Sequence, residues 1–239
     1  MAGRYTPTQP HERLIFALDV PSLDEARQLV ELLHADVGVF KVGLELFTAV
    51  GPVALAPIQG HGRKVFLDLK LHDIPATVER AVGAAVTLGV SYLTLHAAAG
   101  PAALAAAAKV TQGTSLQLLA VTMLTSADDA LLDAVGLRGP LPSAVSRLAK
   151  LAVDSGVHGL VCAPSDCAAL RAELGSEVLL VTPGVRPLGA DNQDQKRVGS
   201  PSAALAAGAD LLVVGRPIRD AHEPRAAARQ IVQEIARSV

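Results

Sequence analysis

The sequence predicts an α/β protein of the (β/α)8 class, a TIM barrel, on the basis of three observations. Eight short apolar runs recur along the 239 residues, and helical material follows each of them. Strands that alternate with helices pair in parallel, and eight such units close into a barrel. No break in composition suggests a domain boundary. We therefore expect a flexible N-terminal tail over residues 1–12 and a single barrel domain over residues 13–239.

The expected strands are short apolar runs bounded by turn-forming residues. They cover 13–19, 37–43, 91–96, 115–122, 157–162, 177–182 and 210–215, and the third strand opens the stretch 64–75. A doubly wound open sheet is the alternative arrangement. It is less favoured because the first strand ends in ALDVPS and not in a G-x-G-x-x-G turn.

The expected helices begin with a capping box of Ser22 and Glu25, which opens a helix that reaches about His34. Gly51, Pro52 and Pro57 break the next helical region into pieces. A longer polar connection with room for one short helix occupies 126–142. The remaining helical stretches are 44–61, 75–89, 101–109, 143–155, 165–174, 202–207 and 224–237.

The composition argues against several classes of protein. The formal net charge is −2, so the chain lacks the basic excess of a general nucleic-acid binder. Cys162 and Cys167 have C-x4-C spacing, which matches neither redox nor paired zinc motifs, so we interpret them as reduced packing residues. We find no signal peptide and no charge-free apolar run of about 18 residues. We expect a soluble, cytoplasmic protein with neither nucleic-acid nor membrane partners.

The stretch KVFLDLKLHDIP, from Lys64 to Pro75, carries an unusual set of charges for an apolar strand. Because side chains of a strand alternate between its faces, Asp68 and Lys70 should share one face. Asp73 follows beyond the strand, in a loop or at a helix start. One interpretation is a structural ion pair. The other is a charge array that holds a catalytic lysine, since burial and neighbouring charges tune such groups.

Further polar residues lie at the expected carboxyl ends of strands, where barrels of this class place their active sites. Most also have an ordinary structural interpretation: Asp19 as a helix cap, His96 as a core histidine and Thr122 as a partner of the backbone. Their clustering at one end of the barrel is the stronger argument for a site. The residues concerned are Asp19, Lys41, His96, Thr122, Thr125 and Thr182.

The loops after the seventh and eighth strands are expected to bind phosphate, as they often do in such barrels. Gly215, within VVGRPI, brings backbone N–H groups close to a ligand, and Arg216 adds a charged fork. Arg186 and Gln195 lie in the seventh loop and can close over the same ligand.

Motifs for other chemistry are absent from the sequence. There is no H-E-x-x-H, no G-x-S-x-G and no P-loop. A metal-dependent sugar-phosphate epimerase on this fold would need histidines and carboxylates that converge at several strand ends. Lys41 and Lys70 would repel a divalent cation there, so we do not expect the site to depend on a metal.

The stretch DLKLHDIP, from Asp68 to Pro75, closely resembles the signature of the orotidine 5′-phosphate decarboxylase family. Related sugar-phosphate decarboxylases share D-x-K-x-x-D, but H-D-I-P is the form of the nucleotide family. The resemblance implies conversion of orotidine 5′-monophosphate to UMP and CO2 in de novo pyrimidine synthesis, without metal or organic cofactor. Similar blocks run from the first strand to the last: ALDV at Asp19, FKVG at Lys41, AVTMLTS ending at Ser126, TPGVRP at Arg186, NQDQKRV at Gln195 and VVGRPI at Arg216.

The resemblance also implies roles for the charged residues. Lys70 corresponds to the proton donor to the ring carbon that loses the carboxylate, and Asp68 corresponds to the acid that flanks this carboxylate. Lys41 and Asp19 correspond to residues that contact the ribose and brace the array. Asp73 corresponds to a second acid, which in the family reaches the site from the partner subunit of a homodimer.

The remaining expected substrate contacts follow in the same way. Thr77 corresponds to a residue that approaches the ribose from the partner subunit, Ile74 is a further expected substrate contact, and Thr125 corresponds to a contact to the pyrimidine. The residues that correspond to the family's phosphate-binding residues are Arg186, Gln195, Gly215 and Arg216.

Two other functions stay open at this point. One is a decarboxylase or aldolase that acts on sugar phosphates. The other is a non-catalytic barrel that binds nucleotide phosphates, which the intact set of Asp68, Lys70 and Asp73 argues against.

Overall fold

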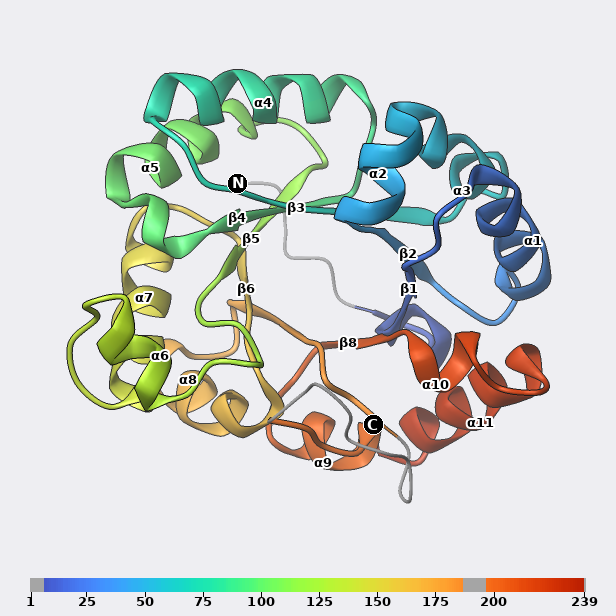
Figure 1. Cartoon of the computed structure of the whole chain (residues 1–239). Helices are drawn as coiled ribbons and strands as arrows, with labels where there is room; N and C mark the ends of the chain where they lie inside the picture. The colour runs from blue at the N-terminus through green and yellow to red at the C-terminus, as the bar shows by residue number, and fades with distance from the viewer. Residues whose placement is uncertain (1–6, 187–196, 239) are drawn as a thin grey trace.

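A computed structural model describes residues 7–186 and 197–238 of the chain. Its eight strands form a closed barrel in which each strand pairs in parallel with the next and β1 pairs with β8. Figure 1 shows the helices arranged around these strands. The predicted (β/α)8 barrel is therefore confirmed, and the open-sheet alternative is wrong. The strands are β1 Leu14–Leu18, β2 Val39–Val42, β3 Lys64–Leu71, β4 Tyr92–His96, β5 Gln117–Val121, β6 Gly159–Val161, β7 Leu179–Thr182 and β8 Leu211–Val214.

Within the described residues, the α-helices lie where the sequence predicts them, with one addition. The short helix after β8 was not expected, because its four residues are too few to show a periodicity. The α-helices are α1 Leu23–Leu33, α2 Leu44–Val50, α3 Ala56–Gly60, α4 Pro75–Thr87, α5 Pro101–Val110, α6 Asp129–Ala134, α7 Leu141–Asp154, α8 Cys167–Leu174, α9 Pro201–Ala206, α10 Arg216–Arg219 and α11 Pro224–Ala236. Single turns of 3-10 helix are η1 Pro10–Arg13, η2 Gly51–Leu55, η3 Ala97–Ala99 and η4 Pro164–Asp166.

The core has two apolar layers, one inside the barrel and one between the strands and the helices. Few aromatic rings contribute, and those of Phe66 and Tyr92 meet edge to face inside the barrel with centroids 6.1 Å apart. Because apolar side chains fill the barrel, polar groups of a site gather at its end. The inner layer consists of Ile15, Ala17, Val39, Phe66, Tyr92, Leu119, Leu179, Val181, Leu211 and Val213.

Part of the segment expected to be a flexible tail packs on the barrel. The η1 turn contacts β1, β8 and α11. The N–H of Gly38 donates to His11 O at 2.9 Å, and a Cβ on Gly38 would lie 2.5 Å from Glu12 Cα. The missing side chain at Gly38 thus lets η1 cover the end of the barrel where the strands begin. Residues 10–12 therefore belong with the barrel.

The two cysteines are buried and form no disulfide, with their Sγ atoms 3.8 Å apart. Cys167 Sγ also lies 3.2 Å from Thr182 Oγ1. The hydrogen bond that Cys162 shares with Cys167, together with burial, raises the pKa of the Cys162 thiol, which stays protonated. Their burial agrees with the interpretation as packing residues.

Among the helices of the described residues, none is both long enough and apolar enough to cross a bilayer.

Candidate active site

A cavity of about 370 Å³ opens at the end of the barrel where the strands finish. Its walls come from six strands and from several loops, including the loop after β7, so residues far apart in the sequence meet there. Gln195, the remaining expected phosphate-binding residue, lies outside the described residues. The predicted residues that line the cavity are Asp19, Lys41, Asp68, Lys70, Thr125, Arg186, Gly215 and Arg216.

Two lysines and two aspartates form a chain of alternating charges at the floor of this cavity. Lys70 Nζ lies 2.8 Å from Asp68 Oδ2, and Lys41 Nζ lies 3.6 Å from the same oxygen. Lys41 Nζ also lies 2.9 Å from Asp19 Oδ1. The side chains of Lys41 and Asp68 are only 11% and 13% exposed. The D-x-K pair is thus part of a larger, largely buried array rather than an isolated ion pair at a strand terminus.

Strand alternation predicts that Asp68 and Lys70 share a face, and an irregular backbone decides how they meet. The pairing of β3 with β4 shifts register between Leu67 and Leu71, and Lys70 has a φ of +51°. This left-handed conformation is rare for a residue other than glycine. It turns the Lys70 side chain so that its ammonium reaches the Asp68 carboxylate. The simple alternation expected for this strand therefore does not hold beyond Leu67.

Thr94, on the neighbouring strand β4, supports this irregular segment and was not singled out from the sequence. Its Oγ1 accepts a hydrogen bond from the backbone N–H of Lys70 at 2.8 Å and donates to Asp68 Oδ1 at 2.9 Å. Thr94 is fully buried. A hydroxyl in the otherwise apolar strand YLTL is a signal for such a role, because buried polar groups need partners.

The pKa of Asp68 reflects a competition between burial and charge. Burial alone raises it, but the ammonium groups of Lys41 and Lys70, with hydrogen bonds from Lys70 and Thr94, outweigh burial. The net result is a pKa below the usual value of 3.8. Asp68 is therefore ionised at neutral pH, and the array carries both signs of charge side by side.

Two glycines leave room for the array. A Cβ on Gly43 would lie 2.9 Å from Lys41 Nζ and 3.1 Å from Asp19 Oδ1. On Gly215 it would lie 3.3 Å from Ala17 Cβ. A side chain at Gly43 would therefore displace the Lys41 ammonium, and one at Gly215 would press on Ala17, so both would disturb the cavity floor.

Cationic groups gather at the side of the cavity formed after β7 and β8. Arg186 is only 8% exposed, and its Nε is buried without a hydrogen-bond partner among the described residues. Arg216 begins α10 directly after Gly215. Arg219, which the sequence analysis missed, also lines the cavity and donates to Asp19 O at 2.7 Å. A buried guanidinium with a free N–H favours an anionic ligand such as phosphate.

Arg197 joins two of the loops that surround the cavity and was likewise missed. Its guanidinium binds both carboxylate oxygens of Asp166, at 2.9 and 2.6 Å, and donates to Leu124 O at 2.9 Å. Leu124 immediately precedes Thr125, so this contact holds the loop that carries Thr125. Both side chains of the pair are nearly buried. Because these partners are far apart in the sequence, local sequence patterns do not predict the contact.

Three of the predicted site residues do not line the cavity of their own chain. Asp73, Ile74 and Thr77 follow β3, and Ile74 is 66% exposed. Asp73 is exposed, and its Oδ1 accepts the backbone N–H of Ile74 at 2.6 Å. All three therefore lie outside the lining of the cavity that their own barrel forms.

The other polar residues at strand ends serve the fold. Thr122 Oγ1 donates to Val161 O at 3.2 Å, in line with its interpretation as a backbone partner. His96 is half-buried and stacks on His72 with ring centroids 5.4 Å apart. Burial and the neighbouring His72 and Lys70 lower the pKa of His96, which favours its neutral form.

A closed barrel with an apolar interior, a buried Lys–Asp–Lys array and arginines at one mouth defines a barrel enzyme for a small anionic substrate. A family-wide sequence profile, described as the orotidine 5'-phosphate decarboxylase / HUMPS family, matches residues 12–231. The chain belongs to this family.

Individual relatives cover almost the whole chain. It is 53% identical over 223 residues to orotidine 5'-phosphate decarboxylase of Anaeromyxobacter sp. (strain K), covering 93% of this chain and 98% of the relative. It is 48% identical to the protein of the same name from Thermobifida fusca, with 93% and 95% covered. The crystal structure of orotidine 5'-phosphate decarboxylase from Lactobacillus acidophilus superposes with a TM-score of 0.82 at 36% identity, with 93% and 98% covered.

Proposed function

We propose that this protein decarboxylates orotidine 5′-monophosphate to UMP and CO2, with Lys70 as the proton donor. The observation that carries the proposal is the array in which Lys70 and Lys41 both contact Asp68 at the barrel mouth. Membership of a decarboxylase family and relatives of that name support the substrate.

The chemistry needs an array of this kind. When the bond from the ring carbon to the carboxylate breaks, CO2 leaves and the electron pair stays on that carbon in the ring plane. The pair cannot delocalise into the carbonyl π system, so preorganised charge must stabilise it. The Lys70 ammonium stabilises the carbanion and then transfers its proton to the same carbon.

Asp68 acts on the substrate before the bond breaks. Its lowered pKa keeps the carboxylate ionised next to the substrate carboxylate. Two like charges about 4 Å apart repel by about 4 kcal/mol at an effective dielectric constant of about 20. This repulsion is relieved as neutral CO2 departs, and Lys41 keeps Asp68 in place during the reaction.

The two ends of the nucleotide would bind on opposite sides of the array. Lys41 and Asp19 contact the ribose, and Thr125 contacts the pyrimidine. The phosphate binds Arg186, Arg216 and the backbone at Gly215, together with Gln195. The buried Nε of Arg186 supports this placement. Binding energy from the phosphate helps to form the productive complex.

The active unit is proposed to be a homodimer in which Asp73 and Thr77 reach the partner's site. Asp73 is exposed, and neither residue lines the cavity of its own barrel, which supports this assignment. Ile74 and Leu44 are 66% and 54% exposed, although both are large apolar residues that follow strands at the mouth. Exposed apolar side chains of this kind suit an interface between subunits.

The direct test is loss of the orotate absorbance when purified protein is mixed with orotidine 5′-monophosphate. Rapid turnover without added metal is expected. A panel of sugar phosphates with and without Mg2+ tests the sister activity on sugar phosphates. If the protein turns over a sugar phosphate but not orotidine 5′-monophosphate, the sister activity replaces the proposed one. UMP binding without turnover would indicate a non-catalytic barrel.

The role of Lys70 is tested by Lys70→Ala, with the exposed Lys109→Ala as the matched control. The Lys70 variant is expected to lose about 10⁴-fold in kcat, since it lacks both the proton donor and the cation at the carbanion. Its affinity for UMP should change much less. Wild-type kcat in the Lys70 variant would contradict the role of the lysine, even if the protein decarboxylates the nucleotide.

Shared sites are tested by mixing two inactive variants, Lys70→Ala and Asp73→Ala. A mixed dimer has one site with both residues intact, so random exchange restores about a quarter of the wild-type sites. No recovery of activity, despite subunit exchange demonstrated by native mass spectrometry, would show that each chain uses its own Asp73.

A further inference from the structure

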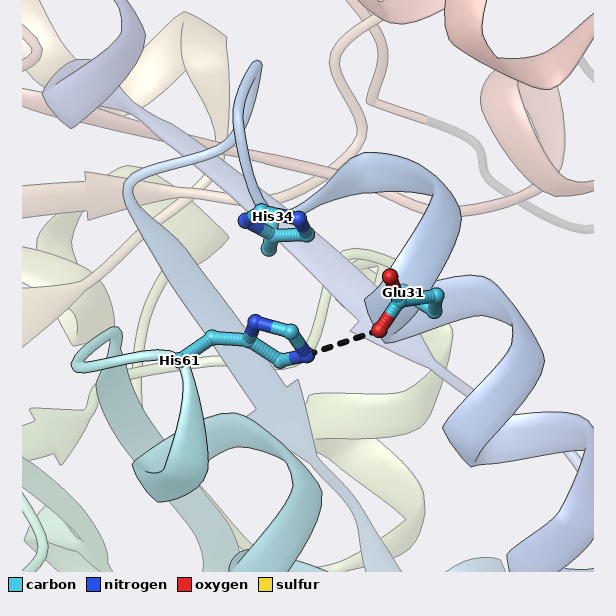
Figure 2. A group of neighbouring side chains, drawn as sticks. All are labelled: Glu31, His34 and His61. Atoms are coloured by element: carbon cyan, nitrogen blue, oxygen red, sulfur yellow. Dashed lines mark ion pairs between the residues drawn. The ribbon is translucent and has the colours of Figure 1, made fainter.

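Three side chains with metal-binding atoms meet on the outside of the barrel. Glu31 and His34 belong to the end of α1, and His61 follows α3 (Figure 2). One ligand atom from each of the three lies within 4.8 Å of the others. His61 Nε2 lies 3.0 Å from Glu31 Oε2, and the two imidazole rings are stacked with centroids 4.1 Å apart.

The backbone sets these three positions. Glu31 and His34 are three residues apart, which places them on one face of a helix. The N–H of His34 still donates to Val30 O at 2.8 Å, so helical geometry continues through this residue. The N–H of His61 donates to Ile58 O at 3.2 Å, in a turn completed by Gly62 at a φ of +64°. Since α1 and α3 contact each other, the cluster links two separate elements.

The cluster lies at the opposite end of the barrel from the active site. His34 precedes β2, which begins at Val39, and His61 precedes β3, which begins at Lys64. These are the ends at which the strands start, whereas the cavity is at the ends at which they finish. The expectation of no metal came from the lysines at the mouth, which do not face this cluster.

We propose that Glu31, His34 and His61 form a binding site for Zn2+ or a similar divalent transition metal. Two imidazoles and one carboxylate are a common zinc ligand set, with water in the fourth position. Mg2+ and Ca2+ prefer oxygen ligands and should not compete. An ion here would tie the end of α1 to the end of α3.

Binding of a metal ion requires only a small movement of the three side chains. Bonds of about 2.1 Å place tetrahedral ligand atoms about 3.4 Å apart. The present separations of up to 4.8 Å therefore need to shorten. The side chain of Glu31 is 73% exposed and that of His61 is 30% exposed, so both can rotate inward.

An open groove beside the cluster gives an ion and its water access from solvent. It is lined by Gln28, Leu32, Ala56 and Pro57, together with Glu31 and His61. Arg27 also lines this groove, but its guanidinium lies 3.4 Å from Asp24, which offsets its charge.

The test is equilibrium dialysis of the full-length, metal-stripped protein against ZnCl2, with bound metal measured by mass spectrometry. One Zn2+ per chain is expected for the wild type. In a parallel dialysis against MgCl2, the protein should retain no Mg2+. Glu31→Gln, His34→Ala and His61→Ala should each weaken Zn2+ binding by at least about tenfold. The matched control is His222→Ala, because His222 is an exposed histidine beside Glu223 but outside the cluster.

Thermal unfolding gives an independent readout. A ligand that binds only the folded state raises Tm, so Zn2+ should raise the Tm of the wild type and of His222→Ala but not that of His61→Ala. Unchanged Tm values in the absence of metal show that the variants are folded. Decarboxylation should not respond to Zn2+ or to a chelator. Failure of the wild type to bind Zn2+, or equal binding by all three cluster variants, would overturn the site.

Discussion

Lys70 combines a charged side chain with a strained backbone. Its φ of +51° is the only positive φ of a non-glycine residue in the described part of the chain. Such a conformation persists only where the surroundings enforce it, and it is typical of functional sites. Here Thr94 Oγ1 accepts the Lys70 N–H and so holds the strained segment. The strain directs the ammonium toward Asp68 instead of away from it.

This strain predicts a difference between two inactive variants. Lys70→Gly and Lys70→Ala both remove the ammonium, but only glycine adopts a positive φ without a steric penalty. We expect Lys70→Gly to be more stable than Lys70→Ala by about 1 kcal/mol in urea unfolding. At Lys109, in helix α5, the alanine variant should instead be more stable than the glycine variant. If alanine is the more stable residue at both positions, Lys70 is not strained.

His158 predicts a pH dependence of stability. Its Nδ1 accepts the backbone N–H of Leu118 at 3.1 Å, and burial lowers its pKa below 6.5. The unfolded chain therefore binds a proton more readily than the folded one below about pH 6.5. The neutral imidazole therefore makes its whole contribution to the free energy of unfolding above that pH. This contribution is lost as the pH falls through the pKa of His158 in the folded state.

The measurement is the free energy of unfolding in urea between about pH 7 and 5, where the unfolded histidine titrates. His158→Asn keeps a hydrogen-bond acceptor but cannot titrate. The fall in stability over this range should be smaller in the variant than in the wild type. A residual slope is expected from His96, whose pKa is also lowered. Equal slopes would show that His158 does not contribute.

At the scale of elements, the loops at the mouth depend on contacts between them. The loop after β5 carries Thr125, and Arg197 binds its carbonyl groups while it also pairs with Asp166 after β6. The three segments come from distant parts of the chain. A single guanidinium thus stabilises the wall of the cavity that is expected to face the pyrimidine.

Removal of this guanidinium should affect stability and binding together. Arg197→Ala leaves the Asp166 carboxylate buried without its partner, which costs about 3 kcal/mol. The exposed Arg225→Ala, which also loses a pair with an aspartate, should cost less than about 1 kcal/mol. The affinity for UMP should fall in the Arg197 variant and not in the control. Unchanged UMP affinity in both variants would limit Arg197 to a role in stability.

At the scale of the molecule, the two ends of the barrel have different tasks. The mouth holds the cavity and its charges, whereas the other end is fastened by η1 and by Asp210. Asp210 Oδ2 accepts from Leu180 N at 2.8 Å and from Arg171 Nη2 at 2.7 Å. The N-terminal end of such barrels is associated with stability and the C-terminal end with activity.

This division predicts that Asp210→Ala lowers stability without changing the chemistry. Loss of the buried carboxylate leaves the Leu180 N–H and the Arg171 guanidinium without that acceptor, at a cost of about 3 kcal/mol. Asp154→Ala, which removes an exposed pair with Lys150, should change stability by less than about 0.5 kcal/mol. At a temperature where the Asp210 variant is folded, its kcat should match the wild type. A marked loss of kcat there would contradict the separation of tasks.

Local patterns were enough to predict the barrel and most of its candidate site. Apolar strands, helical periodicity and turn residues are properties of short segments, so they indicate the eight units directly. In a parallel barrel the carboxyl ends of all strands meet, and this places Asp19, Lys41, Asp68 and Arg186 around one cavity.

Tertiary structure decided the contacts between residues that are distant in the sequence. The φ of Lys70, its support by Thr94 and the bond of Arg197 to Asp166 depend on which strands and loops become neighbours. The meeting of His61 with Glu31 depends equally on the packing of α3 against α1. Sequence patterns report the periodicity of one segment, whereas these contacts arise from packing between segments, which exists only once the barrel has closed.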